Sequence, residues 1–183
     1  MQMLIVEMIE VGKKLGIFGL IDGASGNMSC RVGDFMIITK SGSILDELTP
    51  QDFAYVKIGE YQEGISSDWK VHTKIYEKTD YKAVIHCHGV YNVLLSMLTD
   101  EIVPKDLEGG LFLKRVRVVE GEFGSEEVAD EIAKEIAKRG VVVHKGHGIY
   151  SAGNNVEDAF NRACYLEHSC EILYKHDSSH CKG

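Results

Sequence analysis

The sequence is poor in the residues that usually separate domains. It has two prolines among 183 residues, and it contains no low-complexity run and no internal repeat. We therefore expect no flexible linker and one domain, and a hydrophobic content of 44% is enough to give that domain a buried core. Glu7 and Glu10 interrupt the apolar pattern of the first 20 residues, so we expect neither a signal peptide nor a membrane span there.

Positive charge is also scarce. Twenty lysines and arginines stand against 28 aspartates and glutamates, which gives a formal net charge of -8. Such a surface argues against nucleic acid as the main partner. The net negative charge of the protein would not attract a phosphorylated small molecule. An anion site would therefore have to be built locally from backbone N–H groups and hydroxyls.

The cysteines lack the spacing of a redox or metal motif. Their number is odd, and no two of them form a CxxC pair. Secreted disulfide-rich domains use paired cysteines, whereas the cytosol keeps thiols reduced. We therefore predict a cytoplasmic protein whose thiols are free. The cysteines are Cys30, Cys87, Cys164, Cys170 and Cys181.

Apolar spacing predicts helices mixed with strands. Residues 99–110 are polar and irregular, and we predict no regular element there. The predicted helices lie near residues 4–15, 71–76, 90–98, 128–136 and 156–172. The predicted strands lie at residues 27–32, 35–39, 53–58, 83–85, 114–119, 141–144 and 147–153.

A pair of histidines ends one predicted strand. His86-Cys87-His88 follows the apolar residues 83–85. Residues two apart on a strand face the same side, so His86 and His88 offer two imidazoles to one point, while Cys87 faces away. Neutral imidazole is a good ligand for Zn²⁺ and similar ions. The pair therefore predicts part of a metal site.

Further ligands must come from elsewhere in the chain. His147 follows a buried-type strand and precedes a glycine, but on spacing alone His144 competes with it. Asp68 could add an oxygen. Three histidines and a displaceable group leave an open coordination position for a substrate oxygen, as a catalytic metal site requires. The alternative is a structural site that Asp68 closes permanently.

Two turns, at residues 22–29 and 39–43, are rich in glycine and hydroxyl groups, and a third, at residues 66–69, adds two serine hydroxyls. Glycine permits a positive φ, and successive N–H groups in such turns can hold an anion. Each turn also has an ordinary structural interpretation. Ser66 or Ser67 is a natural N-cap of the following helix, where Asp68 would complement the helix dipole.

Taken in order, these motifs resemble those of the class II aldolase/adducin family, which includes L-fuculose-1-phosphate aldolase and L-ribulose-5-phosphate 4-epimerase. The matching segments span residues 26–148. They are Gly26-Asn27-Met28-Ser29, Thr39-Lys40-Ser41-Gly42, Ser66-Ser67-Asp68-Trp69, His86-Cys87-His88 and Gly146-His147-Gly148.

The resemblance implies one class II aldolase-like domain over residues 1–183. Its fold would be α/β, of the α+β type, with three layers: a central, mostly antiparallel sheet flanked by helices. It also implies a homo-oligomer, usually a tetramer, with active sites at subunit interfaces. Phe123 would then line the neighbouring subunit's pocket, although a place in the core explains this residue equally well.

The resemblance also implies the chemistry of the site. Zn²⁺, or another divalent ion such as Co²⁺ or Mn²⁺, would bind His86, His88 and His147, with Asp68 as a further ligand and as the catalytic carboxylate that moves a proton. A phosphate pocket would be formed by Gly26, Asn27, Ser41, Gly42, Ser66 and Ser67.

The implied function is that of a metal-dependent aldolase that cleaves a small ketose phosphate through a metal-stabilised enediolate. The default substrate is L-fuculose 1-phosphate, giving dihydroxyacetone phosphate and lactaldehyde. A sugar-phosphate epimerase, dehydratase or decarboxylase of the same family is the alternative. A non-catalytic, adducin-like binding domain is a further one, but it has no need of three converging imidazoles.

The sequence departs from the aldolases it resembles in three ways. Asp68 stands where they usually carry glutamate, so the carboxylate reaches less far. The segment between Thr99 and Lys114 is shorter. Their longer C-terminal tail contributes a tyrosine acid, and neither Tyr150 nor Tyr174 corresponds to it, which leaves the acid for the aldehyde fragment unassigned.

Overall fold

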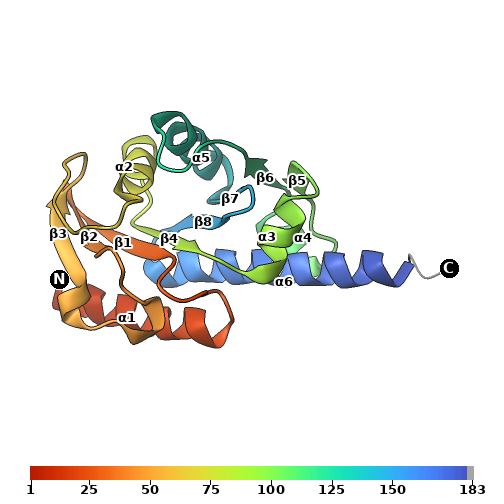
Figure 1. Cartoon of the computed structure of the whole chain (residues 1–183), viewed down its shortest axis with the longest axis horizontal. Helices are drawn as coiled ribbons and strands as arrows, with labels where there is room; N and C mark the ends of the chain where they lie inside the picture. The colour runs from red at the N-terminus through yellow and green to blue at the C-terminus, as the bar shows by residue number, and fades with distance from the viewer. Residues whose placement is uncertain (181–183) are drawn as a thin grey trace.

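The computed structural model describes residues 1–180, in which helices cover both faces of a central sheet (Figure 1). In this range the sheet has eight strands, in the order β3-β2-β1-β4-β8-β7-β6-β5. The described strand pairs are antiparallel except β6 and β7, which are parallel and joined by the crossover helix α5. The strands are β1 (Asn27–Val32), β2 (Phe35–Thr39), β3 (Phe53–Lys57), β4 (Ala83–Cys87), β5 (Glu101–Ile102), β6 (Val116–Val119), β7 (Val141–His144) and β8 (Gly148–Gly153).

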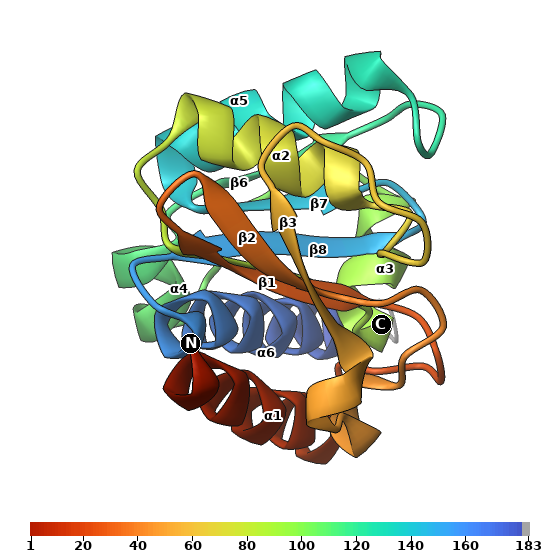
Figure 2. The same cartoon turned by 90° about the vertical axis from the view of Figure 1, so that its left-hand side faces the viewer.

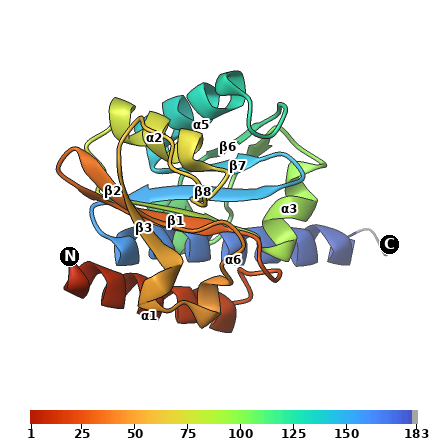
Figure 3. The same ribbon diagram turned by 60° about the vertical axis from the view of Figure 1, so that its left-hand side comes forward.

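The helices form a layer on each side of the sheet (Figures 2 and 3). Helices α2 and α5 lie on one face, and α1 and α6 lie on the other. This arrangement confirms the predicted three-layer fold with a mostly antiparallel sheet. The helices are α1 (Gln2–Ile17), α2 (Trp69–Lys78), α3 (Val90–Ser96), α4 (Leu107–Phe112), α5 (Glu126–Arg139) and α6 (Val156–His180), with 3-10 turns η1 (Leu45–Glu47) and η2 (Pro50–Asp52).

Strand β4 divides its side chains between the two faces. Ala83, Ile85 and Cys87 belong to the apolar cluster packed against α1 and α6. Val84 belongs to the cluster packed against α2 and α5. Side chains alternate along a strand, so His86 faces the same layer as Val84. The sequence pattern of this strand thus decides which side of the sheet carries the first histidine.

The register of three strands then brings distant residues together. Asn27 on β1 lies opposite His86 on β4, and His86 lies opposite Tyr150 on β8. Directly paired residues of neighbouring strands project to the same side of a sheet. Asn27, His86 and Tyr150 therefore form a row across the sheet beneath the start of α2.

The prediction of no regular structure at residues 99–110 is wrong. Glu101 and Ile102 form β5, which pairs with β6, and α4 begins just after Asp106. The Asp106 carboxylate accepts a hydrogen bond from the Gly109 N–H at 2.8 Å, which caps that helix. A two-residue strand and a six-residue helix are too short to leave a periodic apolar pattern.

The long helix α6 extends past the end of the sheet (Figure 1). No helix among residues 1–180 is both long enough and apolar enough to cross a membrane.

The cysteines of the described residues are not paired. Cys30, Cys87, Cys164 and Cys170 are free thiols, and Cys181 lies outside the described residues.

The turn between α1 and β1 depends on two glycines with positive φ. Gly23 has φ +88° and Gly26 has φ +90°. A Cβ atom on Gly26 would lie 2.8 Å from the carbonyl oxygen of His86, whereas a Cβ atom on Gly23 would meet nothing within 4 Å. Only Gly26 therefore lets the turn approach the backbone of β4, and this approach places Asn27 beside His86.

This contrast supplies a matched pair of variants. Each substitution by alanine forces an L residue into a left-handed conformation, at a cost of about 1–2 kcal/mol. Gly26→Ala should cost roughly 1–3 kcal/mol more than Gly23→Ala, because its methyl group also displaces β4. Urea unfolding measures the difference, and equal losses in the two variants would contradict the close approach.

Candidate active site

Three histidines converge at one end of the sheet. The Nε2 atoms of His86 and His88 lie 2.8 Å apart, and those of His86 and His147 lie 3.3 Å apart. Two nitrogens bound tetrahedrally at about 2.0–2.1 Å to a zinc ion lie about 3.3 Å from each other. The three rings therefore have the spacing of a metal ligand set.

The outer nitrogens of two rings define which nitrogen carries the proton. The Nδ1 atom of His86 lies 2.9 Å from the carbonyl oxygen of Ile149, and Nδ1 of His88 lies 3.0 Å from a carboxylate oxygen of Asp22. A carbonyl oxygen only accepts, so Nδ1 of His86 donates, and the negative charge of Asp22 favours a proton on the nearby Nδ1 of His88. A neutral ring then has a bare Nε2 atom, which is the form that binds a metal.

The electrostatics of the site favour neutral rings. Burial lowers the pKa of His86 well below its usual range, and the neighbouring His88 and His147 lower it further. Burial, His88 and His144 together lower the pKa of His147 to about 4. Near neutral pH these two rings therefore present lone pairs to each other. Such close lone pairs repel unless a cation lies among them, so the donor set fits a divalent ion.

His147, rather than His144, brings its Nε2 atom to this cluster. Its ring follows the turn after β7, and the next residue is Gly148. A Cβ atom at Gly148 would lie 2.7 Å from Cδ2 of His88 and 3.3 Å from Cε1 of His86. Glycine is thus required after His147 because the other two rings occupy the space of a side chain. His144 contacts His147 through the opposite side of the ring.

Asp68 lies beneath the histidines and is 3% exposed. It is the N-cap residue of α2, yet its side chain makes no capping hydrogen bond. Instead, its Oδ2 atom accepts hydrogen bonds from Asn27 Nδ2 at 2.9 Å and from the Tyr150 hydroxyl at 3.0 Å, and it lies 3.7 Å from His86 Nε2. Its buried Oδ1 atom has no hydrogen-bond partner among the described residues. A buried carboxylate with one unpaired oxygen, whose other oxygen lies close to His86, also fits a cation.

Sequence reasoning missed the role of Tyr150. Its ring stacks on His86, with ring centres 4.0 Å apart. Burial and the charge of Asp68 raise its pKa well above the usual range, so the hydroxyl keeps its proton and donates a hydrogen bond to Asp68. Only the β4–β8 register reveals this neighbour, and the sequence carries no sign of that pairing.

Sequence reasoning also left out His72, although it lies one helical turn after Asp68. Asn27 donates its amide N–H to Asp68, so its Oδ1 atom accepts from His72 Nε2 at 2.6 Å. His72 Nδ1 then accepts from the Ser29 hydroxyl at 2.6 Å, and Ser29 accepts from Tyr76 at 2.8 Å. This buried chain fixes the orientation of the Asn27 amide. The i, i+4 spacing from Asp68 was the available sequence signal.

All six residues of the predicted phosphate pocket line one cavity of about 200 Å³ together with the three histidines. They come from the turn before β1, the turn after β2 and the turn before α2. Four further lining residues were not predicted for the pocket: Ala24, Ser25, Lys40 and Phe123. Lys40 donates a hydrogen bond to the Gln51 carbonyl at 2.7 Å, and Phe123 meets the His147 ring edge-on at 5.1 Å. Phe123 is 49% exposed, so it is not a core residue.

A second cavity, of about 550 Å³, is also lined by His88 and His147. Its wall includes Val90, Val93 and Asp22. His88 and His147 thus line both a pocket of glycine and hydroxyl groups and a pocket with an apolar wall.

Known proteins are similar to this chain in sequence and fold. The family described as Class II Aldolase and Adducin N-terminal domain matches residues 6–174. The chain belongs to this family. It is similar to the L-fuculose phosphate aldolase of Methanocaldococcus jannaschii, with 32% identity over 170 residues that cover 91% of this chain and 93% of that protein. It is also similar to the L-fuculose phosphate aldolase of Escherichia coli (strain K12), with 27% identity over 175 residues that cover 91% and 79%, respectively.

The crystal structure of L-fuculose-1-phosphate aldolase from Thermus thermophilus superposes on this chain with a TM-score of 0.94. The two are 32% identical, and the match covers 98% of this chain and 97% of that one. This likeness confirms the predicted class II aldolase-like fold. Family and relatives assign the chain to the class II, metal-dependent aldehyde-lyases.

The buried His72 gives a prediction about pH. Burial lowers its pKa from 6.5 to about 4, so between these values the unfolded chain binds a proton that the folded chain excludes. Stability should therefore fall as the pH drops from about 6.5 to about 4, with roughly 2–3 kcal/mol of that loss due to His72.

Urea unfolding of the metal-free protein at pH 7 and pH 4.5 tests this prediction. His72→Gln should lose less stability between the two pH values than the wild type does. Replacement of the exposed His168 by glutamine is the control for the loss of an imidazole at the surface. An unchanged dependence in His72→Gln would show that His72 does not titrate in this way.

Proposed function

We propose that this chain is a metal-dependent aldolase that cleaves a small ketose phosphate. L-Fuculose 1-phosphate, giving dihydroxyacetone phosphate and lactaldehyde, is the substrate we favour, because the relatives named above act on that class of compound by name. The observation that carries the proposal is the cavity in which three imidazole nitrogens adjoin a pocket of glycines and hydroxyls.

We propose Zn²⁺ as the ion held by His86, His88 and His147, with Asp68 as a further ligand. Three neutral imidazoles and a carboxylate suit zinc, and Co²⁺ or Mn²⁺ could replace it. When bound, the divalent ion would act as a Lewis acid for negative charge that develops on substrate oxygens. The proximity of Asp68 Oδ2 to His86 Nε2, at 3.7 Å, supports this assignment.

The phosphate would bind in the first cavity. Gly26, Asn27, Ser41, Gly42, Ser66 and Ser67 line it with small and hydroxyl side chains, which suits an anion in a protein of formal net charge -8. Binding at this end would hold the sugar in place, so that interactions remote from the reacting carbons help to position them. The carbon chain would extend past the histidines toward the apolar wall formed by Val90 and Val93.

Asp68 would be the catalytic carboxylate. Asn27 and Tyr150 hold its Oδ2 atom, which leaves Oδ1 as the oxygen able to exchange a proton with substrate. In the cleavage direction it would deliver a proton to the carbon freed by the broken carbon–carbon bond, and in condensation it would remove that proton. The short aspartate side chain fits this role here because α2 begins directly beside His86.

The experiment is an assay of dihydroxyacetone phosphate released from L-fuculose 1-phosphate by zinc- or cobalt-loaded protein. We expect release that a chelator abolishes. Cleavage of unphosphorylated L-fuculose, followed by release of dihydroxyacetone, should be far slower. Asp68→Asn, which keeps the shape of the side chain, should fold normally and lose about 100-fold or more in turnover. No release by folded, metal-loaded protein would reject this aldolase activity and favour the epimerase, dehydratase or decarboxylase alternatives.

We further propose that residues 1–183 act as one cytoplasmic, class II aldolase-like domain that assembles with copies of itself, as a tetramer by resemblance to its family. Supporting this proposal, large apolar side chains are exposed on and near α3 and α4. They include Val90, Met97, Leu98, Leu107, Leu111 and Phe112. Native mass spectrometry of the purified protein should give a multiple of the 20.3 kDa chain mass, and a purely monomeric mass would reject the assembly.

A further inference from the structure

We propose that His144 is a positioning residue of the metal centre: it accepts a hydrogen bond from His147 and so keeps the Nε2 atom of His147 bare and aimed at the ion. The inference rests on the proposed three-histidine site but not on the identity of the substrate.

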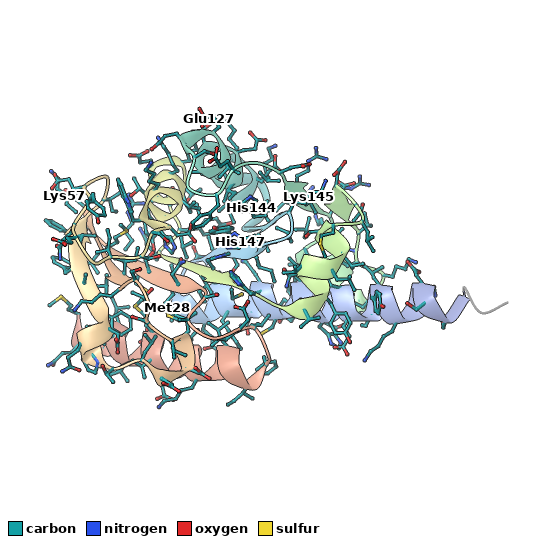
Figure 4. All side chains as sticks on the ribbon, viewed as in Figure 1. Met28, Lys57, Glu127, His144, Lys145 and His147 are labelled. Carbon is teal, nitrogen blue, oxygen red and sulfur yellow. The ribbon has the colours of Figure 1, made fainter. Side chains whose placement is uncertain are left out.

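His144 is the last residue of β7 and is buried, with 4% of its surface exposed. A tight turn follows, in which the His147 N–H donates to the His144 carbonyl at 3.0 Å. The turn reverses the chain direction so that β8 pairs antiparallel with β7. The imidazoles of His144 and His147 therefore lie next to each other at the end of this hairpin (Figure 4). Their Nδ1 atoms are 3.1 Å apart.

The direction of this hydrogen bond follows from the other end of His144. Its Nε2 atom lies 3.0 Å from the carbonyl oxygen of Gly121. A carbonyl only accepts, so Nε2 carries the proton, and a neutral His144 then has a bare Nδ1. His147 must therefore donate through its own Nδ1 atom. Its Nε2 atom is left with a free lone pair, 3.3 Å from Nε2 of His86.

The opposite arrangement would prevent metal binding. If His147 carried its proton on Nε2, that hydrogen would point toward the other two ligands and occupy the position of the ion. An acceptor beside Nδ1 is what excludes this tautomer. His86 uses a strand carbonyl for the purpose and His88 uses Asp22, whereas His147 depends on another imidazole.

The same contacts clamp the ring of His147. Gly121 lies in the segment between β6 and α5, and the same segment carries Phe123. The Phe123 ring meets His147 edge-on at 5.1 Å, and the His144 ring meets it at 5.2 Å. The hydrogen bond from His144 to Gly121 therefore ties this segment to the strand that leads to the third ligand.

The strand itself does not need an imidazole at this position. Residues 141–143 are three buried valines, and a leucine in place of His144 would continue the apolar run. Leucine and asparagine have nearly the same shape, but only asparagine offers an oxygen that can accept the His147 Nδ1 proton. His144→Leu and His144→Asn are thus a matched pair that differs in the acceptor.

The test is the affinity of the full chain for Co²⁺, followed by its visible absorption in competition with a chelator. Loss of the partner that orients a metal-bound histidine typically costs 10–100-fold in affinity. We expect His144→Leu to lose about that much, and His144→Asn to stay within roughly 3-fold of the wild type. Wild-type affinity in His144→Leu, or equal losses in both variants, would overturn the acceptor role.

A measurement on the wild type covers the case in which a variant does not fold. Nitrogen-15 NMR of the zinc-loaded protein should show the proton of His147 on Nδ1 and that of His144 on Nε2. The reverse assignment would overturn the inference while leaving the metal centre intact. A wild-type protein that binds neither Co²⁺ nor Zn²⁺ would reject both the proposed centre and the role of His144.

Discussion

The repulsion between imidazole lone pairs is the constraint on which this site depends. Three rings direct Nε2 toward one point, with neighbouring nitrogens 2.8 and 3.3 Å apart. Burial opposes protonation of His86 and His147, so a proton is a poor means of relieving this repulsion near neutral pH. A divalent cation relieves it and uses all three lone pairs at once. Its binding should therefore stabilise an arrangement that the metal-free fold holds under electrostatic repulsion.

The sheet keeps the rings together despite this repulsion. Each Nδ1 atom has a partner: the Ile149 carbonyl for His86, Asp22 for His88 and His144 for His147. Beneath them, the β1–β4–β8 register places Asn27 and Tyr150 on either side of His86, and both donate to Asp68. The three histidines, the carboxylate and the lining of the first cavity thus come from strand ends and turns at one end of the sheet.

Local patterns predicted those parts of the site that depend on one element. The two-residue period of a strand placed His86 and His88 on one side, and an apolar run followed by a glycine singled out His147, with His144 as its rival. The six residues of the predicted phosphate pocket were identified by the resemblance of their motifs to those of the family, and all six line one cavity in the structure. The three-layer fold was predicted in the same way and is confirmed.

Residues whose role depends on pairing between distant segments could not be found in this way. Tyr150 meets Asp68 only because β8 pairs with β4 in one register, and His72 meets Asn27 only because α2 crosses over β1. His144 was an alternative to His147 as a ligand because sequence spacing cannot show which ring nitrogen contacts which neighbour. In the structure, His144 contacts Nδ1 of His147 and not the three Nε2 atoms. Short elements such as β5 were missed because two residues carry no periodicity.

The most direct test of the account is X-ray absorption spectroscopy of the zinc-loaded protein. We predict about three imidazole nitrogens at about 2.0–2.1 Å from the metal, with the remaining position or positions filled by oxygen, and no sulfur. Removal of one ring by His86→Ala should reduce the imidazole scattering. A sulfur shell at about 2.3 Å, or a first shell without imidazole, would contradict the three-histidine centre.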